Sequence, residues 1–276
     1  MRRHIGRILA CVFAFVWLVP GFGAIDLTVT WDPDWPQVLE AGWGVFFSFL
    51  VAVPLLLVAV RPSTARPAVV QLAVAAAALA VSAPVANEVG VAALAAVIAV
   101  ETAVVATLLG LAWDLREARD VSVPLLALGA VGAGPWLEYA FQMWAANRGA
   151  RFDSDVTNGV DHYSVQGALG LALATLPLLA GIRADLRRLV TACCGVAAAY
   201  LGLVSYAWPD AAGGFGRAWS VTAMAWGVLL VAVAAVDAVR ARVRIASPGP
   251  AAPRPPAGRA PVEPSLAAPR APARTG

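Results

Sequence analysis

Eight apolar segments, each near the length at which an α-helix crosses a bilayer, dominate this sequence. They are Ile8–Ala24, Trp43–Val60, Ala68–Val85, Val91–Trp113, Val121–Trp144, Ser164–Ile182, Leu189–Trp208 and Ala218–Val239. A helix of about 20 residues spans the hydrocarbon core, and it satisfies its own backbone hydrogen bonds, which lipid cannot do. The alternating pattern of a membrane barrel strand is absent. We therefore predict an all-α, polytopic helical bundle of about eight transmembrane helices.

Composition supports contact with the lipid bilayer. The chain is 60% hydrophobic and only 13% charged, whereas a soluble domain carries about 25% charged residues. It has no nucleotide-binding motif, no nucleophile triad and no Cys/His spacing for zinc; its cysteines, Cys11, Cys193 and Cys194, lie in apolar runs. We expect no cofactor and no nucleic-acid partner, because the arginines behind the basic pI are better explained by topology.

The arginines predict the orientation of the bundle. With a cytoplasmic N-terminus, thirteen fall at inner ends: Arg2, Arg3, Arg7, Arg61, Arg66, Arg116, Arg119, Arg183, Arg187, Arg188, Arg240, Arg242 and Arg244. Three fall in outer loops: Arg148, Arg151 and Arg217. Positive charge is retained on the cytoplasmic side of membrane proteins. We predict a bacterial cytoplasmic-membrane protein with both termini inside.

The two ends of the chain differ from its middle. The stretch "MRRHIGRILACVFAFVWLVPGFGA" could be a first span or a cleaved secretory signal, which would leave seven spans. We favour the span, because Trp17 and Pro20 make a poor cleavage region. Residues 245–276 are rich in Pro, Ala and Arg, so they predict a disordered cytoplasmic tail after a transmembrane domain of residues 1–244.

Glu101 is the one acid predicted near mid-membrane. Its helical neighbours are large and apolar, so it should be either protonated or bonded to a Gln, Thr, Tyr or Trp of another helix. Such a residue either forms a structural hydrogen bond between helices or serves as a proton or cation site, and both interpretations stay open. Its segment also carries a small-residue stripe at helical spacing, for which we expect helix packing: Ala92, Ala96, Ala99, Ala103, Ala106 and Gly110.

Acids and tryptophans concentrate on the predicted outer side. The acids are Asp26, Asp32, Asp34, Glu40, Glu88, Glu138, Asp153, Asp155, Asp161 and Asp210, and the tryptophans are Trp31, Trp35, Trp43, Trp136, Trp144, Trp208 and Trp219. They could form a mouth that attracts and stacks a cationic ligand. The simpler alternative is that acids are excluded from the arginine-rich side. Pro54, Pro135 and Pro177 should kink their spans, most of all in "GAVGAGPWLEY".

The polar stretch "RFDSDVTNGVDHYSVQ" precedes the sixth span. Asn158-Gly159 predicts a tight turn, and Asp161 or Ser164 can cap the helix that follows. Asp161 with His162 is a candidate pair for proton handling or ligand binding. Asp153 and Asp155 weakly suggest a calcium loop, although its glycine is one place late. We predict no other metal site.

The segment "TNGVDHYSVQGALGLAL", Thr157 to Leu173, resembles a segment of uncharacterised multi-pass membrane proteins of high-GC actinobacteria. The resemblance covers under a tenth of the chain, implies a membrane protein and carries no activity with it.

Three function hypotheses remain. The first is a non-catalytic protein, structural or accessory to a partner complex. The second is a transporter or small-molecule binding protein that uses Glu101 and the acidic, Trp-rich outer mouth. The third is a membrane enzyme acting on a lipid-like substrate, which requires several of five outer side chains to converge: Glu40, Glu88, Glu138, Asp161 and His162.

Overall fold

The computed structural model describes residues 1–111, 120–149 and 156–246. The helices are α1 (Arg2–Leu18), α2 (Gly23–Val29), α3 (Gln37–Val45), α4 (Val53–Val60), α5 (Ala65–Ala86), α6 (Val89–Leu109), α7 (Val123–Arg148), α8 (His162–Ile182), α9 (Arg187–Ala207) and α10 (Gly216–Ala246). A π-helical segment, Phe46–Ala52, joins α3 to α4, and a 3₁₀ turn, Pro62–Thr64, precedes α5. The short strands β1 (Val156–Thr157) and β2 (Val160–Asp161) form an antiparallel hairpin.

The predicted all-α membrane bundle is confirmed. Seven helical stretches in the described chain are long and apolar enough to cross a membrane: Arg2–Val29, Gln37–Val60, Pro62–Ala86, Val89–Leu109, His162–Ile182, Arg187–Ala207 and Gly216–Val239. The predicted fifth span corresponds to α7, which has 26 residues but is not among the seven. It carries the polar residues Glu138, Gln142 and Asn147.

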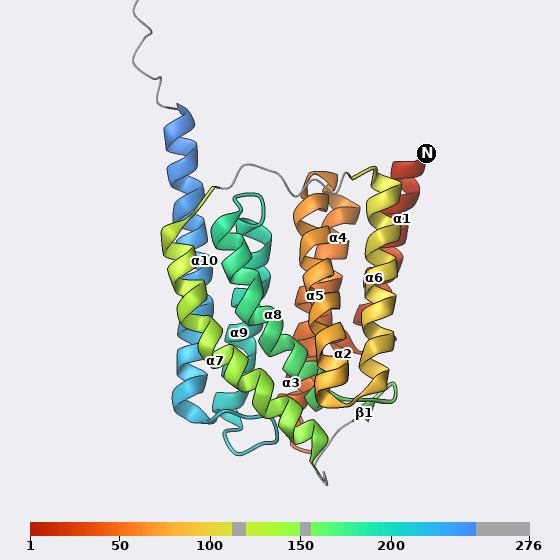
Figure 1. Cartoon of the computed structure of the whole chain (residues 1–276), viewed down its shortest axis with the longest axis vertical. Coiled ribbons are helices and arrows are strands. Elements are labelled where there is room, and N and C mark those ends of the chain that lie inside the picture. Colours follow the sequence, from red (N-terminus) through yellow and green to blue (C-terminus); the bar gives the residue numbers. More distant parts are fainter. Residues whose placement is uncertain (112–119, 150–155, 247–276) are drawn as a thin grey trace, which may run out of the picture. The chain divides into compact units, whose positions relative to one another are not determined.

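The long helices of residues Met1–Ala238, which form one compact unit, run up and down between two ends (Figure 1). We call the end that carries β1 and β2 the hairpin end. The α5–α6 turn, the end of α7 and the α9–α10 connection lie there too. Of the ten arginines with described side chains, only Arg148, at the end of α7, and Arg217, in the first turn of α10, belong to elements that reach the hairpin end there. The described part of the chain therefore keeps the charge asymmetry that the sequence predicts.

Helix α8 is the most buried of the candidate spans, and it packs most extensively against α7. Two glycines make this approach possible. A Cβ added to Gly167 would lie 2.1 Å from the indole nitrogen of Trp144, and one added to Gly170 would lie 2.7 Å from the carbonyl oxygen of Trp136. Without a hydrophobic drive in lipid, such close contact is what holds membrane helices together.

Several predicted interfacial tryptophans belong instead to the interior. Trp43 and Trp144 are buried, and the indole nitrogen of Trp144 donates to the Ser82 hydroxyl over 2.8 Å. Trp31, Trp35 and Trp219 are about half exposed. Some of the predicted outer tryptophans therefore pack inside the bundle and others lie on its surface. The position of a tryptophan along a span does not distinguish the two cases.

Pro54 leaves a backbone gap that another helix fills. A proline has no N–H to donate to the carbonyl four residues earlier in an α-helix or five residues earlier in a π-helix. These are the carbonyls of Leu50 and Phe49. The side-chain nitrogen of Gln71, on α5, lies 3.1 Å from the Phe49 oxygen and 3.4 Å from the Leu50 oxygen. Gln71 is fully buried, so it stabilises this irregular turn from outside the helix.

Glu101 has a partner from another helix. The indole nitrogen of Trp17 donates to its carboxyl group over 2.7 Å, so the expectation of a bond to a neighbouring helix is confirmed. Trp17 belongs to α1, which packs against α4 and α6 and also holds the Ala59 carbonyl through Arg7 at 2.7 Å. The first apolar segment thus contributes to the bundle along its length.

The small-residue stripe of α6 is mostly exposed in the described chain. Ala92, Ala96, Ala99 and Ala103 are exposed, and Ala106 is the only buried alanine among the stripe residues. With alanines of α5 they line a shallow groove. The prediction of helix packing for this stripe is not tested by the described chain, because periodicity identifies a uniform helix face without identifying its neighbour.

The predicted tail, residues 245–276, lies outside the described residues except for Ile245 and Ala246, the last two residues of α10. The described residues Val239–Ala246 belong to a second unit.

Candidate metal centre

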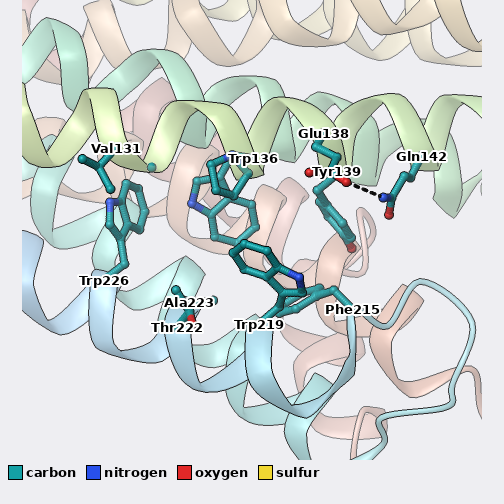
Figure 2. Close-up of a pocket in the computed structure, with 12 residues that line it drawn as sticks. Val131, Trp136, Glu138, Tyr139, Gln142, Phe215, Trp219, Thr222, Ala223 and Trp226 are labelled. Carbon is teal, nitrogen blue, oxygen red and sulfur yellow. Dashed lines mark hydrogen bonds between the residues drawn. The ribbon is translucent and has the colours of Figure 1, made fainter.

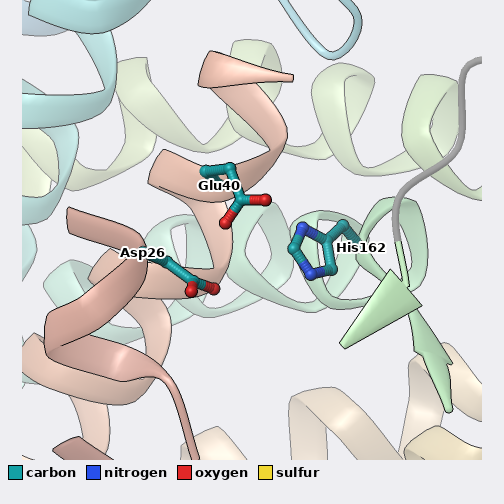
Figure 3. A group of neighbouring side chains, drawn as sticks. All are labelled: Asp26, Glu40 and His162. Carbon is teal, nitrogen blue, oxygen red and sulfur yellow. The ribbon is translucent and has the colours of Figure 1, made fainter. Parts of the chain in front are cut away.

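Three side chains from three separate segments meet near the hairpin end. They are Asp26 of α2, Glu40 of α3 and His162, the first residue of α8. Their potential ligand atoms all lie within 4.8 Å of one another, and Figure 3 shows the carboxylates and the imidazole turned toward each other. Relative exposure is 2% for each acid and 0% for the histidine. The group is therefore enclosed by protein.

A tight reversal after α1 brings Asp26 into the group. Phe22 has a φ of 65°, in the left-handed region that a bulky residue seldom adopts. A Cβ added to Gly23 would lie 2.8 Å from the carbonyl oxygen of Trp17, so this position requires glycine. Helix α2 then packs against α3, with Asp26 buried in its first turn.

Helix α3 supplies both a carboxylate and a wall for the histidine. Glu40 and Trp43 are three residues apart, so they share one helix face. The Trp43 ring stacks on the His162 imidazole at 4.8 Å between centroids and 25° between planes. Its indole nitrogen donates to the carbonyl oxygen of Gly21 over 2.9 Å. This bond ties the stacking ring to the reversal that places Asp26.

The β1–β2 hairpin fixes the other side of His162. Asn158 and Gly159 have φ values of 54° and 79°, the conformation of a tight two-residue hairpin turn. The predicted turn is confirmed, and it pairs Thr157 with Val160. The Thr157 hydroxyl oxygen lies 2.8 Å from Nε2 of His162. A hydrogen bond at one ring nitrogen fixes the orientation of a ligand histidine, which leaves Nδ1 for the carboxylates or a metal.

Asp161 caps helix α8. Its side chain accepts a hydrogen bond from the backbone N–H of Tyr163 over 3.0 Å, and the Ser164 hydroxyl donates to its carbonyl oxygen over 2.6 Å. The predicted cap is confirmed. This cap starts α8 at the next residue, His162, and so holds the imidazole at the helix entrance.

Two carboxylates and one imidazole form a ligand set suited to a divalent transition metal. Zinc ligands lie about 2.0–2.2 Å from the ion, so two ligand atoms of a tetrahedral site are about 3.4 Å apart. The three potential ligand atoms lie within 4.8 Å of one another, so side-chain rotations have to bring them closer when a metal binds. A divalent cation between the three side chains would compensate the charge of both carboxylates.

Ser48 is a further polar group beside α2. Its hydroxyl is buried and has no hydrogen-bond partner among the described residues. It faces Gly23, one turn before Asp26, where an added Cβ would lie 3.2 Å from the hydroxyl oxygen. Buried unpaired polar atoms in native proteins commonly mark a bound water or ion.

The other predicted site residues lie apart from this group. Glu88 immediately precedes α6 without a side-chain cap bond. Glu138 is exposed on α7 and accepts a hydrogen bond from Gln142 over 3.3 Å. Glu101 is bonded to Trp17. The predicted calcium ligands, Asp153 and Asp155, lie outside the described residues.

Sequence reasoning missed the metal group as a unit. It placed Asp26 and Glu40 on the same predicted side as His162, but no local motif joins residues 26, 40 and 162. The available signal was that all three lie at the same predicted end of the first, second and sixth spans. That signal places the three residues on the same side of the membrane, but this side is much larger than a metal site, so the signal does not predict that they meet.

Comparison with known proteins gives no match to a family model, a curated protein or a solved structure.

Proposed function

We propose that this chain is a multi-pass protein of the bacterial cytoplasmic membrane that binds a divalent metal ion through Asp26, Glu40 and His162. The observation that carries the proposal is the convergence of these three buried side chains within 4.8 Å. The imidazole favours a transition metal such as zinc or manganese, because calcium takes oxygen ligands only.

The metal has a structural role in this proposal. Its ligands belong to α2, α3 and α8, so one ion connects three segments that are distant in sequence. A metal that binds only the folded chain stabilises it. This agrees with the non-catalytic hypothesis, in which the protein is a structural or accessory component of the membrane.

An integral-membrane enzyme is the second candidate. Three protein ligands leave a coordination position for water or substrate, as in catalytic zinc sites. The transporter hypothesis has less support, because Glu101 is bonded to Trp17 and does not belong to the three-residue group.

The proposed orientation has both termini in the cytoplasm and the metal centre on the outer side. The support is the arginine distribution: eight of the ten described arginine side chains lie away from the hairpin end. In that orientation the centre would take its metal from outside the cell.

Metal analysis of the full-length chain tests the proposal. Protein purified in detergent without chelators should contain about one transition-metal ion per chain by mass spectrometry. A metal at 100 times its dissociation constant adds about 2.7 kcal/mol of stability. Chelation should therefore lower the melting temperature, and zinc or manganese should restore it. Binding should weaken at acidic pH, because the ligands must be deprotonated.

The matched variants are Glu40→Gln and Asp26→Asn, which preserve side-chain size, and Glu138→Gln, which removes an acid outside the group. The first two should lose the metal and its stabilisation, whereas Glu138→Gln should retain both. A metal-free protein that does not respond to added metal would show that an internal ion-pair cluster occupies this position instead. Metal-dependent turnover of a lipid-like substrate would favour the enzyme.

A further inference from the structure

A second site lies between α7 and α10, on side chains that the metal group does not use. It is a cavity of about 330 Å³, within the usual size of small-molecule sites. Figure 2 shows Trp136 on α7 and Trp219 and Trp226 on α10 around the cavity, with Glu138 beside Gln142 on α7. Its lining is mainly aromatic and aliphatic, with a few polar groups.

The aromatic wall is held in place by specific contacts. A Cβ added to Gly132 would lie 2.4 Å from the Trp226 ring, so the glycine admits the indole. The indole nitrogen of Trp226 donates to the carbonyl oxygen of Leu128 over 2.9 Å. Trp136 lies 5.9 Å from Trp226 and 6.2 Å from Phe215 between ring centroids. These contacts hold the aromatic side chains in place in the absence of a ligand.

The polar side chains of the cavity, indoles aside, are a carboxylate, an amide and two hydroxyls: Glu138, Gln142, Tyr139 and Thr222. Glu138 is exposed and is bonded to Gln142 over 3.3 Å. Pro135 lacks the N–H that would bond the carbonyl of Val131, and both residues line the cavity. The α7 helix continues through this proline. No basic residue is present in the described lining.

An acid beside several indoles matches one ligand chemistry. An alkylammonium group is attracted to indole faces by the cation–π interaction and to a carboxylate by charge. Trp219 is 53% exposed, so its ring is accessible to such a cation. The apolar part of the cavity can accept the attached hydrocarbon chain.

We propose that the cavity between α7 and α10 binds an amphipathic organic cation. Its ammonium group lies against Glu138 and the indoles, and its chain lies along the Val131 and Ala223 side. A lipid with an amine headgroup and a free alkylamine share this chemistry.

The test uses full-length protein in a neutral detergent and three probes with one chain length: octylamine, octanol and octanoate. Octylamine should raise the melting temperature most and bind about tenfold more tightly than octanol. Glu138→Gln should abolish this advantage, and Ala223→Phe should weaken both probes by filling the cavity. Asp210→Asn, which removes an exposed acid outside the cavity, should behave as the unaltered protein.

Equal binding of octylamine and octanol, or an unchanged preference in Glu138→Gln, would overturn the proposal and leave a generic apolar groove. Mass spectrometry of co-purified lipid distinguishes the two sources. Enrichment of phosphatidylethanolamine over phosphatidylglycerol that is lost in Glu138→Gln identifies the lipid headgroup. Octylamine binding without such enrichment identifies a free amine.

Discussion

Asp161 and His162 are adjacent in the chain but have different roles. The Asp161 carboxylate bonds to the backbone of the first turn of α8, whereas the His162 ring packs between Trp43 and Thr157 and faces two other acids. At the scale of single residues, the acid determines where the helix begins and thereby positions the histidine. Mutations at the two positions should therefore have separable effects.

Replacing Asp161 should affect stability more than metal binding. We expect Asp161→Ala to lower the free energy of unfolding by about 1 kcal/mol, while Asp161→Asn and Asp161→Ser, which retain a capping oxygen, cost little. Thermal unfolding in detergent would measure the difference. Equal damage from all three variants would indicate that the charge of Asp161 matters in addition to its hydrogen bond.

We expect the protein to tolerate the substitution of Glu101 by Gln, but not by a side chain that has no oxygen. Glu101→Gln retains an acceptor for the Trp17 indole, so its stability should remain near that of the original chain. Glu101→Leu should lose about 1 kcal/mol. A double-mutant cycle with Trp17→Phe would isolate the bond. If a pH- or cation-linked activity is found and Glu101→Gln abolishes it, the residue is more than an interhelical bond.

At the scale of elements, Pro54 and Gln71 form a compensating pair. Gln71→Leu should destabilise the chain by about 1–3 kcal/mol, because two buried carbonyls lose their donor. Pro54→Ala provides a backbone N–H for one of them, so the double variant should recover part of the loss. The unfolding free energies of the four chains give the coupling. Additive losses would show that Gln71 acts only by packing.

The same pair illustrates how far the sequence predicts these elements. Hydropathy identifies the spans, and the residue types at Asn158-Gly159 and Asp161 predict the turn and the cap, because each depends on local chemistry. The partner of Pro54 is not predictable in this way, since Gln71 is 17 positions away on another helix. The Asp26–Glu40–His162 group was missed for the same reason. Local patterns predict elements, and close packing then determines which side chains meet.

At the scale of the whole molecule, the most important question is whether the first helix is retained or removed by signal cleavage. Helix α1 carries Trp17, the partner of Glu101, and it precedes the reversal that places Asp26. Signal cleavage before Ala24 would remove both the helix and Gly23. We therefore expect the mature protein to retain α1. Intact-mass measurement of the purified chain tests this, and a mass that lacks the first 23 residues would contradict it.

The predicted orientation places the hairpin end, and with it the metal centre, outside the cell. Asn158 is exposed at the β1–β2 turn, and Ser63 is exposed at the opposite end between α4 and α5. In a chain with Cys11 replaced by Ser, and with Cys193 and Cys194 buried, Asn158→Cys should react with an impermeant thiol reagent in intact cells. Ser63→Cys should react only after the membrane is permeabilised. The reverse pattern would invert the bundle and place the metal centre on the cytoplasmic side.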